Sequence, residues 1–402
     1  MNSRWDRGDI EERRTCSAPP QRPRQGCGFV SVWMKRESWH APFGVTVRIL
    51  YAGGACNDES CNCPRSKRRR KAKRMPLAGI VGPCHERERF LLACRATHFV
   101  RSRVMGETIN VGLIGLDSSH TVEFARRMVA PDCPEDQRVF GLRPLTCLRF
   151  PSPFQSEAGL DQRQKLLEDW GIKVTTLFRE AVAGCDALML EINDPAQHLE
   201  YIEACADLGK MIFLDKPMAD SIANGRRILE LARSKDLKIL SMSSLRLPQA
   251  LVSACEKMPR PLFAHAFGAY GTAPAGSSIV WYGVHTFEML QRAMGRGASG
   301  VYTRQDGAGV TAVVRYPENR RGVVELSEGA HVYGGVLRDR ERAIPFVADT
   351  SRTYVDQLVR VEKFFRTGET PLELEDTFEV MAMLDAAQRS LDSGKEEEVG
   401  NA

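Results

Sequence analysis

The most constraining feature of this chain is a regular alternation of short apolar runs with amphipathic segments between residues 109 and 243. Parallel strands need crossover connections, and helices supply them, so this alternation indicates a parallel sheet covered by helices on both faces. The pattern predicts an α/β domain of the Rossmann-like, doubly wound type. Its expected strands are 109–115, about 144–149, 185–191, 211–215 and 238–243, and its expected helices are 119–130, 160–170, 195–208 and 219–235.

After residue 243 the pattern changes to strands of alternating or β-branched character, separated by glycines and charged turns. Such strands predict an α+β domain with a large, mostly antiparallel open sheet that has one face covered. The expected strands are 262–270, 300–304, 310–316, 322–327, 331–337 and 343–347, and the expected helices are 279–294, 351–367 and 373–392. We therefore divide the chain into a Rossmann-like domain at 107–243, a substrate and oligomerisation domain at 244–394 and a tail at 395–402.

The first 106 residues differ in composition from the rest, with 22 Lys and Arg against 9 Asp and Glu. They show no sustained period, and we expect a disordered or spurious extension. Two other interpretations stay open: the basic run 65–74 suits nucleic acid or nuclear import, and the group Cys56, Cys61 and Cys63 suggests zinc. The cysteine spacing fits no common zinc motif. We expect no nucleic-acid partner.

Composition also limits where the protein works. Hydrophobic residues make up 43% of the chain and charged residues 27%, as in ordinary globular proteins. No apolar stretch reaches the roughly 18 residues of a membrane span, and the N-terminus lacks the apolar core of a secretory signal. We expect a cytoplasmic protein without a membrane partner, whose later cysteines are buried, reduced thiols.

The segment Asp215-Lys216-Pro217 ends one of the expected strands. In an open α/β sheet, ligands bind at the carboxyl ends of the strands. A lysine on a surface loop is the ordinary alternative, but the adjoining Pro217 favours a site. Lys216 is therefore the first candidate for chemistry.

Several motifs occur together in a recognisable order: Gly112-Leu-Ile-Gly115, the turn from Asn193 to His198, Asp215-Lys216-Pro217 and Gly283-Val-His285. Over about residues 109–394 the chain resembles the family of glucose-fructose oxidoreductase, inositol dehydrogenase and MocA (Gfo/Idh/MocA). The resemblance implies an oxidoreductase that uses NAD or NADP and acts on a sugar, cyclitol or related polyol. It further implies a catalytic lysine matching Lys216, a cis bond before Pro217, and a homodimer or homotetramer.

The chemistry of alcohol oxidation gives roles to these residues. Hydride removal from a secondary alcohol leaves a developing carbonyl, and the hydroxyl proton must move to a positioned base. Lys216 can polarise the oxygen and His285 can relay the proton. We expect substrate contacts from Arg246 and from Trp281, which stands where the family often has an aspartate. A salt bridge between the domains is the alternative role for Arg246.

The dinucleotide fingerprint is altered. The family's glycine-rich turn corresponds here to residues 115–120, where only Gly115 survives and Asp117 and His120 replace glycines. A carboxylate beside a pyrophosphate repels it by roughly 1 kcal/mol or more in a partly desolvated cleft. Arg149 is compatible with NADP but is as readily a surface residue. The expected cofactor contacts are Gly115, Asp117, Ser118, Ser119, His120, Glu191, Asn193, His198, Asp215 and Pro217.

These changes gather at one sheet edge, which leaves alternatives to the redox function. The chain could act as a lyase, epimerase or hydrolase, assisted by a metal at Asp117, His120 and Glu191. It could also bind sugars without catalysis. The leading hypothesis includes no metal, because Asp117 and His120 can rebuild the turn through side-chain hydrogen bonds.

Overall fold

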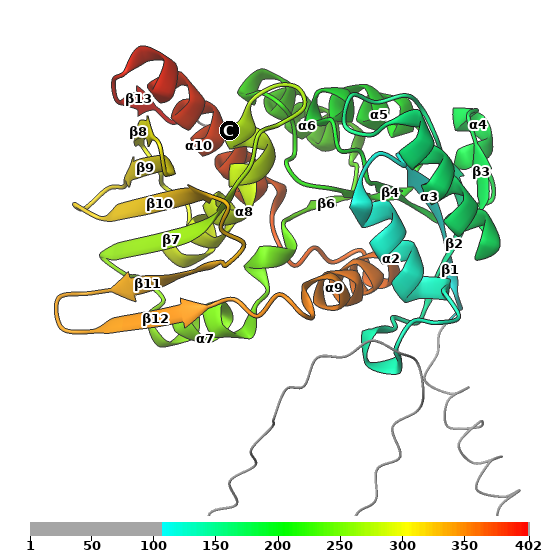
Figure 1. The fold of residues 1–402 in the computed structure, drawn as a ribbon, viewed down its shortest axis with the longest axis horizontal. Helices are drawn as coiled ribbons and strands as arrows, with labels where there is room; N and C mark the ends of the chain where they lie inside the picture. The colour runs from blue at the N-terminus through cyan, green and yellow to red at the C-terminus, as the bar shows by residue number, and fades with distance from the viewer. Residues whose placement is uncertain (1–106, 401–402) are drawn as a thin grey trace, which may run out of the picture. The chain divides into compact units, whose positions relative to one another are not determined.

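The computed structural model describes residues 107–400, which form two sheets with helices around them (Figure 1). The expected extension at 1–106 lies outside the described residues, as do the last two positions. Both sheets belong to one compact unit of the chain.

The first sheet has six strands in the order β3-β2-β1-β4-β5-β6, and all of its pairings are parallel. This order confirms the doubly wound fold, with the strand order reversing direction between β1 and β4. The carboxyl ends of these two strands and of β5 meet at one edge. The strands are β1 (Ile109–Ile114), β2 (Leu142–Leu148), β3 (Lys173–Thr175), β4 (Ala187–Leu190), β5 (Met211–Leu214) and β6 (Ile239–Ser241).

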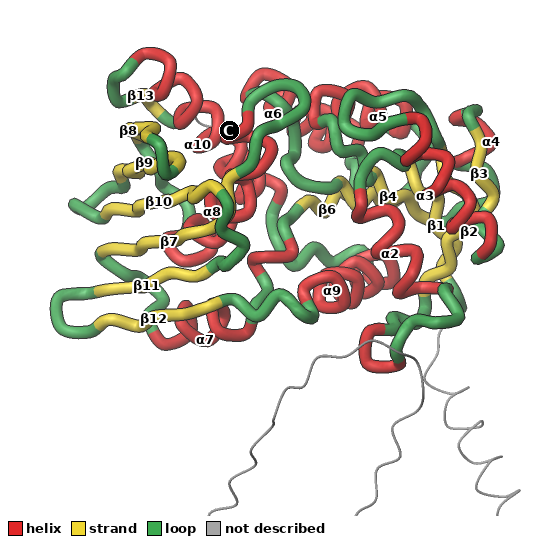
Figure 2. The backbone as a smooth tube through the Cα atoms, viewed as in Figure 1, coloured by secondary structure: helices red, strands yellow, loops and turns green. Residues whose placement is uncertain are grey.

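Helices cover both faces of this sheet, as Figure 2 shows. One apolar core joins the first sheet to α2, α3 and α9 and includes Phe124, Leu160 and Phe364. The other core lies on the opposite face and continues without a break into the second sheet. The helices that pack around the first sheet are α2 (Ser119–Val129), α3 (Glu157–Asp169), α4 (Phe178–Ala181), α5 (His198–Cys205), α6 (Ile222–Lys235) and α9 (Thr353–Thr367).

The second sheet has seven strands in the order β12-β11-β7-β10-β9-β8-β13. Only β7 and β10 pair in parallel within it, so the expected mostly antiparallel sheet is confirmed. The strands are β7 (Phe263–Tyr270), β8 (Gly300–Asp306), β9 (Gly309–Arg315), β10 (Arg321–Glu328), β11 (Gly334–Arg338), β12 (Ala343–Val347) and β13 (Glu397–Glu398). The helices beside it are α7 (Gln249–Lys257), α8 (Ser278–Met294) and α10 (Leu374–Ser393).

The sequence pattern missed β3, α4, α7 and β13, which are short or interrupted. It also placed α9 in the second domain, whereas this helix returns to the first sheet and buries Val355, Leu358 and Val361 there. The connection between β12 and α9 therefore crosses from one sheet to the other, and it passes the edge where β1, β4 and β5 end (Figure 1).

Within the described part of the chain, no helix is both long and apolar enough to cross a membrane. The cytoplasmic location expected from the sequence stays a prediction.

Candidate active site between the two sheets

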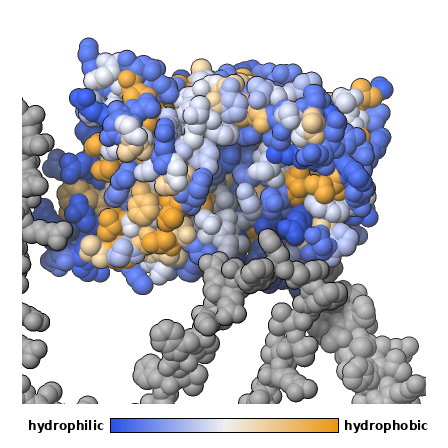
Figure 3. Space-filling model, in the orientation of Figure 1, coloured by the Kyte–Doolittle hydropathy of each residue, from blue (hydrophilic) through white to orange (hydrophobic). Residues whose placement is uncertain are grey.

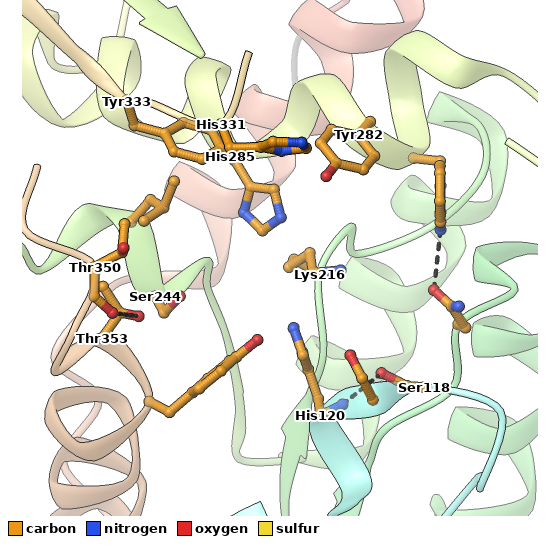
Figure 4. A pocket seen from close by; sticks show the side chains of 15 residues that line it. Ser118, His120, Lys216, Ser244, Tyr282, His285, His331, Tyr333, Thr350 and Thr353 are labelled. Atoms are coloured by element: carbon orange, nitrogen blue, oxygen red, sulfur yellow. Dashed lines mark hydrogen bonds between the residues drawn. The ribbon is translucent and has the colours of Figure 1, made fainter. Parts of the chain in front are cut away.

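A cavity of about 410 Å³ lies at the carboxyl edge of the first sheet, against α8 of the second (Figure 4). Three parts of the chain line it: the edge loops of the first sheet, helix α8 with the loop before β11, and the start of α9. Its walls carry amine, imidazole and hydroxyl groups. The lining residues are Ser118, Ser119, His120, Asn193, Lys216, Ser244, Leu245, Trp281, Tyr282, His285, His331, Tyr333, Thr350, Thr353 and Tyr354.

Lys216 is the second residue after β5, and its peptide bond to Pro217 is cis, as the family resemblance implies. The side chain is 10% exposed, and Figure 4 shows it between His285 above and His120 below. Its Nζ lies 4.0 Å from Asp215 Oδ2. The lysine is thus held near one carboxylate while it remains part of the cavity wall.

His285 faces the same cavity from α8, where its Nδ1 lies 2.7 Å from Ser243 Oγ. Burial, together with the nearby Lys216 and His120, lowers the pKa of His285 well below 6.5. The imidazole is therefore neutral at physiological pH, and a neutral imidazole can accept a proton. Ser243 orients the ring through Nδ1.

Asp215 directly follows β5 and is 1% exposed. Its Oδ2 lies 2.8 Å from His120 Nδ1. Burial disfavours the charge on this carboxylate, but contact with His120 and the charge of Lys216 lower its pKa overall. Asp215 is therefore ionised, and it links the first turn of α2 to the lysine.

Glu191 follows β4 and is fully buried at the same edge. Neither of its carboxylate oxygens has a hydrogen-bond partner among the described residues. Burial and the neighbouring Asp215 raise the pKa of Glu191 well above 4.5. Its backbone carbonyl also explains the surviving glycine, because a Cβ on Gly115 would lie 2.8 Å from that oxygen and Gly115 has φ +106°.

Asp117 does not face the cavity. Its carboxylate is 1% exposed and accepts hydrogen bonds from Ser152 Oγ at 2.6 Å and Asn193 N at 3.0 Å. Burial raises its pKa. The expected repulsion between this carboxylate and a pyrophosphate is therefore weakened, because the charge is both turned away and disfavoured.

Ser118 and Ser119 lie at the start of α2. Ser118 caps the helix by accepting a hydrogen bond from His120 N at 3.1 Å, while Ser119 is exposed in the cavity. The positive end of the helix dipole therefore points toward the cavity at this position.

Asn193 and Trp281 connect the two sheets across the site. Trp281 Nε1 on α8 donates to Asn193 Oδ1 at 2.9 Å. The Trp281 ring also contacts Phe154, with 5.7 Å between centroids. The tryptophan that replaces the family's aspartate thus forms a wall of the cavity.

Two residues that we expected in the site, Arg246 and His198, are held outside the cavity wall by their contacts with other residues. Arg246 is 5% exposed, and its guanidinium donates to Glu288 Oε2 at 2.8 Å and to Gln291 Oε1 at 2.7 Å. It does not line the cavity, so the salt-bridge alternative replaces the expected substrate contact. His198 is fully buried, with its two ring nitrogens against the backbone oxygens of Ile192 and Met218, so it supports the loop instead of contacting a ligand.

Sequence reasoning missed about half of the cavity wall. These residues come from the loop before β11, the start of α9, and the neighbours of residues already chosen. Tyr282 could have been found, because it lies near His285 on the same helix. The loop positions offered no such signal in the sequence. The missed residues are Ser244, Leu245, Tyr282, His331, Tyr333, Thr350, Thr353 and Tyr354.

Comparison with known proteins matches one part of the chain to a family. Residues 156–243 match the model of the oxidoreductase family with an NAD-binding Rossmann fold, GFO_IDH_MocA. No curated protein matches the chain.

Solved structures share the fold. A probable dehydrogenase from Thermotoga maritima is 17% identical, with a TM-score of 0.60, over 72% of this chain and 99% of that one. The apo scyllo-inositol dehydrogenase from Lactobacillus casei is 12% identical, with a TM-score of 0.61, over 73% and 99%. An oxidoreductase from Agrobacterium radiobacter, solved with NAD+, L-tartaric acid and magnesium, is 13% identical, with a TM-score of 0.57, over 73% and 98%.

The matched segment runs from α3 to β6, so this part of the first sheet is similar to an oxidoreductase family with an NAD-binding Rossmann fold. The matched segment and the shared fold agree with the resemblance to the Gfo/Idh/MocA oxidoreductases that the sequence motifs indicate.

The carboxyl edge of the first sheet fits the phosphates of a dinucleotide. The N-terminus of α2 favours an anion, Ser119 offers an exposed hydroxyl, and Asp117 is turned away. These residues would hold the phosphates, whereas the expected contacts from Glu191 and Asp215 are not part of the cavity lining.

Proposed function

We propose that this protein is an NAD(P)-dependent oxidoreductase that acts on a secondary alcohol of a sugar, cyclitol or related polyol. The observation that carries the proposal is the position of Lys216 and His285 in the wall of one cavity at the carboxyl edge of an NAD-binding type of sheet. The polar lining supports a small hydroxylated substrate, because hydroxyl and imidazole groups can exchange hydrogen bonds with substrate hydroxyls.

Lys216, His285 and Asp215 have different roles in the proposed reaction. Lys216 donates a hydrogen bond to the reacting oxygen and stabilises the negative charge that grows on it. His285 is neutral, since burial and Lys216 lower its pKa, and it accepts the hydroxyl proton. Asp215 keeps the ammonium of Lys216 near the sheet edge. A bound nicotinamide dinucleotide would supply the hydride acceptor for this oxidation.

Aromatic groups shape the remainder of the cavity. Tyr282 and Tyr333 lie on either side of His285, with ring centroids 6.3 and 6.0 Å from it. Together with Trp281 they form an amphipathic wall that excludes bulk water from the reacting oxygen. Such a wall suits a ring with hydroxyls on its edge and C–H groups on its face.

Cofactor titration tests the proposal. Purified full-length protein is titrated with NADH and with NADPH while the nicotinamide fluorescence is followed. We expect saturable binding of at least one of them, and replacement of Ser119 by Glu should weaken it because the new carboxylate would face the phosphates. Absence of binding of either nucleotide at millimolar concentration would contradict the proposed function.

We also propose that the open face of the second sheet joins copies of the chain in a homodimer or homotetramer. Register brings partly exposed side chains into a row across neighbouring strands, including Tyr302, Val313, Val323 and Val336. Figure 3 shows apolar side chains gathered over this half of the molecule. Light scattering after size exclusion tests this, and Val323→Glu should shift an oligomer toward monomer. A wild-type protein that elutes as a monomer would contradict it.

A further inference from the structure

Three side chains from different strand ends converge beneath the cavity. His120 lies in the first turn of α2, the helix after β1, while Glu191 directly follows β4 and Asp215 directly follows β5. One ligand-type atom from each lies within 4.8 Å of the other two, and all three residues are buried. Because β1, β4 and β5 are neighbours in the sheet, the topology itself brings these residues together.

Glu191 is the unexplained member of this cluster. It is fully buried, and neither carboxylate oxygen meets a donor among the described residues. An ionised carboxylate without a partner is strongly disfavoured in a protein interior. A proton on Glu191 solves only half of the problem, because its hydroxyl could donate to the nearby Asp215 carboxylate while its carbonyl oxygen would still lack a donor. No group among the described residues satisfies both oxygens of Glu191.

The basic groups nearby do not provide the missing partner of Glu191. Lys216 Nζ lies 4.0 Å from Asp215, and no ion pair joins it to Glu191 among the described residues. His120 directs Nδ1 to Asp215 at 2.8 Å. Lys216 and His120 therefore lie closest to Asp215, and neither donates a hydrogen bond to Glu191.

A divalent cation fits the cluster. One imidazole nitrogen and two carboxylate oxygens are ligands that Mn²⁺, Fe²⁺ and Zn²⁺ accept. Metal–ligand bonds of about 2.1 Å place tetrahedral ligand atoms roughly 3.4 Å apart, so a modest adjustment from the present spacing suffices. His120 also lines the cavity, which leaves an open direction for water or substrate.

We propose that His120, Glu191 and Asp215 form a binding site for a divalent first-row transition ion beneath the cavity. The site differs from the ligand set expected from the sequence, because Asp117 is already satisfied by Ser152 and Asn193 and does not join the cluster. Binding of the ion does not depend on the proposed redox function, and neither does its test.

The test measures ion binding directly. Untagged full-length protein is stripped with EDTA, dialysed, and titrated with MnCl₂ by calorimetry, and thermal unfolding is followed in parallel. Mn²⁺ is the better probe than Zn²⁺, because the chain has 12 cysteines and thiolates attract zinc. We expect about one Mn²⁺ per chain and a melting temperature that rises with ion concentration, since a ligand that binds only the folded state stabilises it.

Three variants locate the ion. Glu191→Gln and His120→Asn should each weaken Mn²⁺ binding about tenfold or more, the scale seen when a supporting group of a metal site is lost. Asp117→Asn is the matched control, because it alters a buried carboxylate of the same sheet edge outside the cluster, and it should bind Mn²⁺ as the wild type does.

Two results would overturn the proposal. One is wild-type protein that neither binds Mn²⁺ nor gains thermal stability from it. The other is binding that persists unchanged in both Glu191→Gln and His120→Asn, which would place the ion elsewhere. If one of these variants does not fold, the other variant and the wild-type melting series still decide.

Discussion

Two buried glutamates within this molecule have opposite surroundings. Glu288 is 1% exposed on α8 and is satisfied by Arg246 at 2.8 Å and by the backbone N–H of Ser243 at 3.1 Å. Glu191 is fully buried at the sheet edge and has no partner among the described residues. The same side chain therefore serves stability where its charge is matched, and marks a ligand site where it is not.

The largest expected effect comes from breaking the satisfied pair. Arg246→Ala leaves Glu288 buried with an uncompensated charge and leaves Gln291 without its donor, so unfolding should be easier by about 3–5 kcal/mol. Urea denaturation measures the change. The control is Arg260→Ala, which breaks the exposed contact with Glu318 and should cost about 1 kcal/mol or less. Equal losses for the two variants would refute the structural role of Arg246.

His285 should make the stability depend on pH. It lies beside the Arg246–Glu288 pair, since Ser243 contacts both His285 and Glu288. Burial and the charge of Lys216 lower the pKa of His285 well below 6.5, so below pH 6.5 the unfolded chain binds a proton that the folded chain does not. The wild type should therefore lose stability relative to His285→Asn by up to about 1.4 kcal/mol per pH unit as pH falls from 6.5.

Urea unfolding of both proteins at pH 7.5 and pH 5.5 measures this difference. A stability gap that stays constant between the two pH values would show that the imidazole titrates alike in the folded and unfolded chains.

The smallest effect sharpens the contrast between the glutamates. In metal-free protein, Glu191→Gln replaces a buried carboxyl group that has no hydrogen-bond partner among the described residues, and the variant should be as stable as the wild type or more stable by about 1 kcal/mol. Denaturant unfolding in EDTA measures it. A loss as large as that of Arg246→Ala would mean that Glu191 has a partner inside the protein.

The sequence predicted much of the first sheet, because apolar strands alternate there with helices of clear period. It missed β3, a strand of three residues, and the return of α9 to the first sheet, since apolar periodicity shows that a helix is amphipathic but not which surface it covers. The predicted α8 residues lie where they were expected.

The site was predicted in part for a similar reason. Lys216, His285, Ser119 and Asn193 follow strand ends or a marked helix, so their place in the fold could be inferred. Local sequence could not show that Asp117 turns to Ser152. The roles of Arg246 and Glu191 also depended on neighbours far away in the chain.

The most direct measurement compares turnover by the wild type and Lys216→Met with NAD+ or NADP+ and a panel of inositols and sugar alcohols. Lys216 contributes through charge at the reacting oxygen, so we predict that turnover falls about 10²–10⁴-fold in the variant. Affinity for the reduced nucleotide should stay within about threefold. Turnover that survives in Lys216→Met at the wild-type rate would contradict the account.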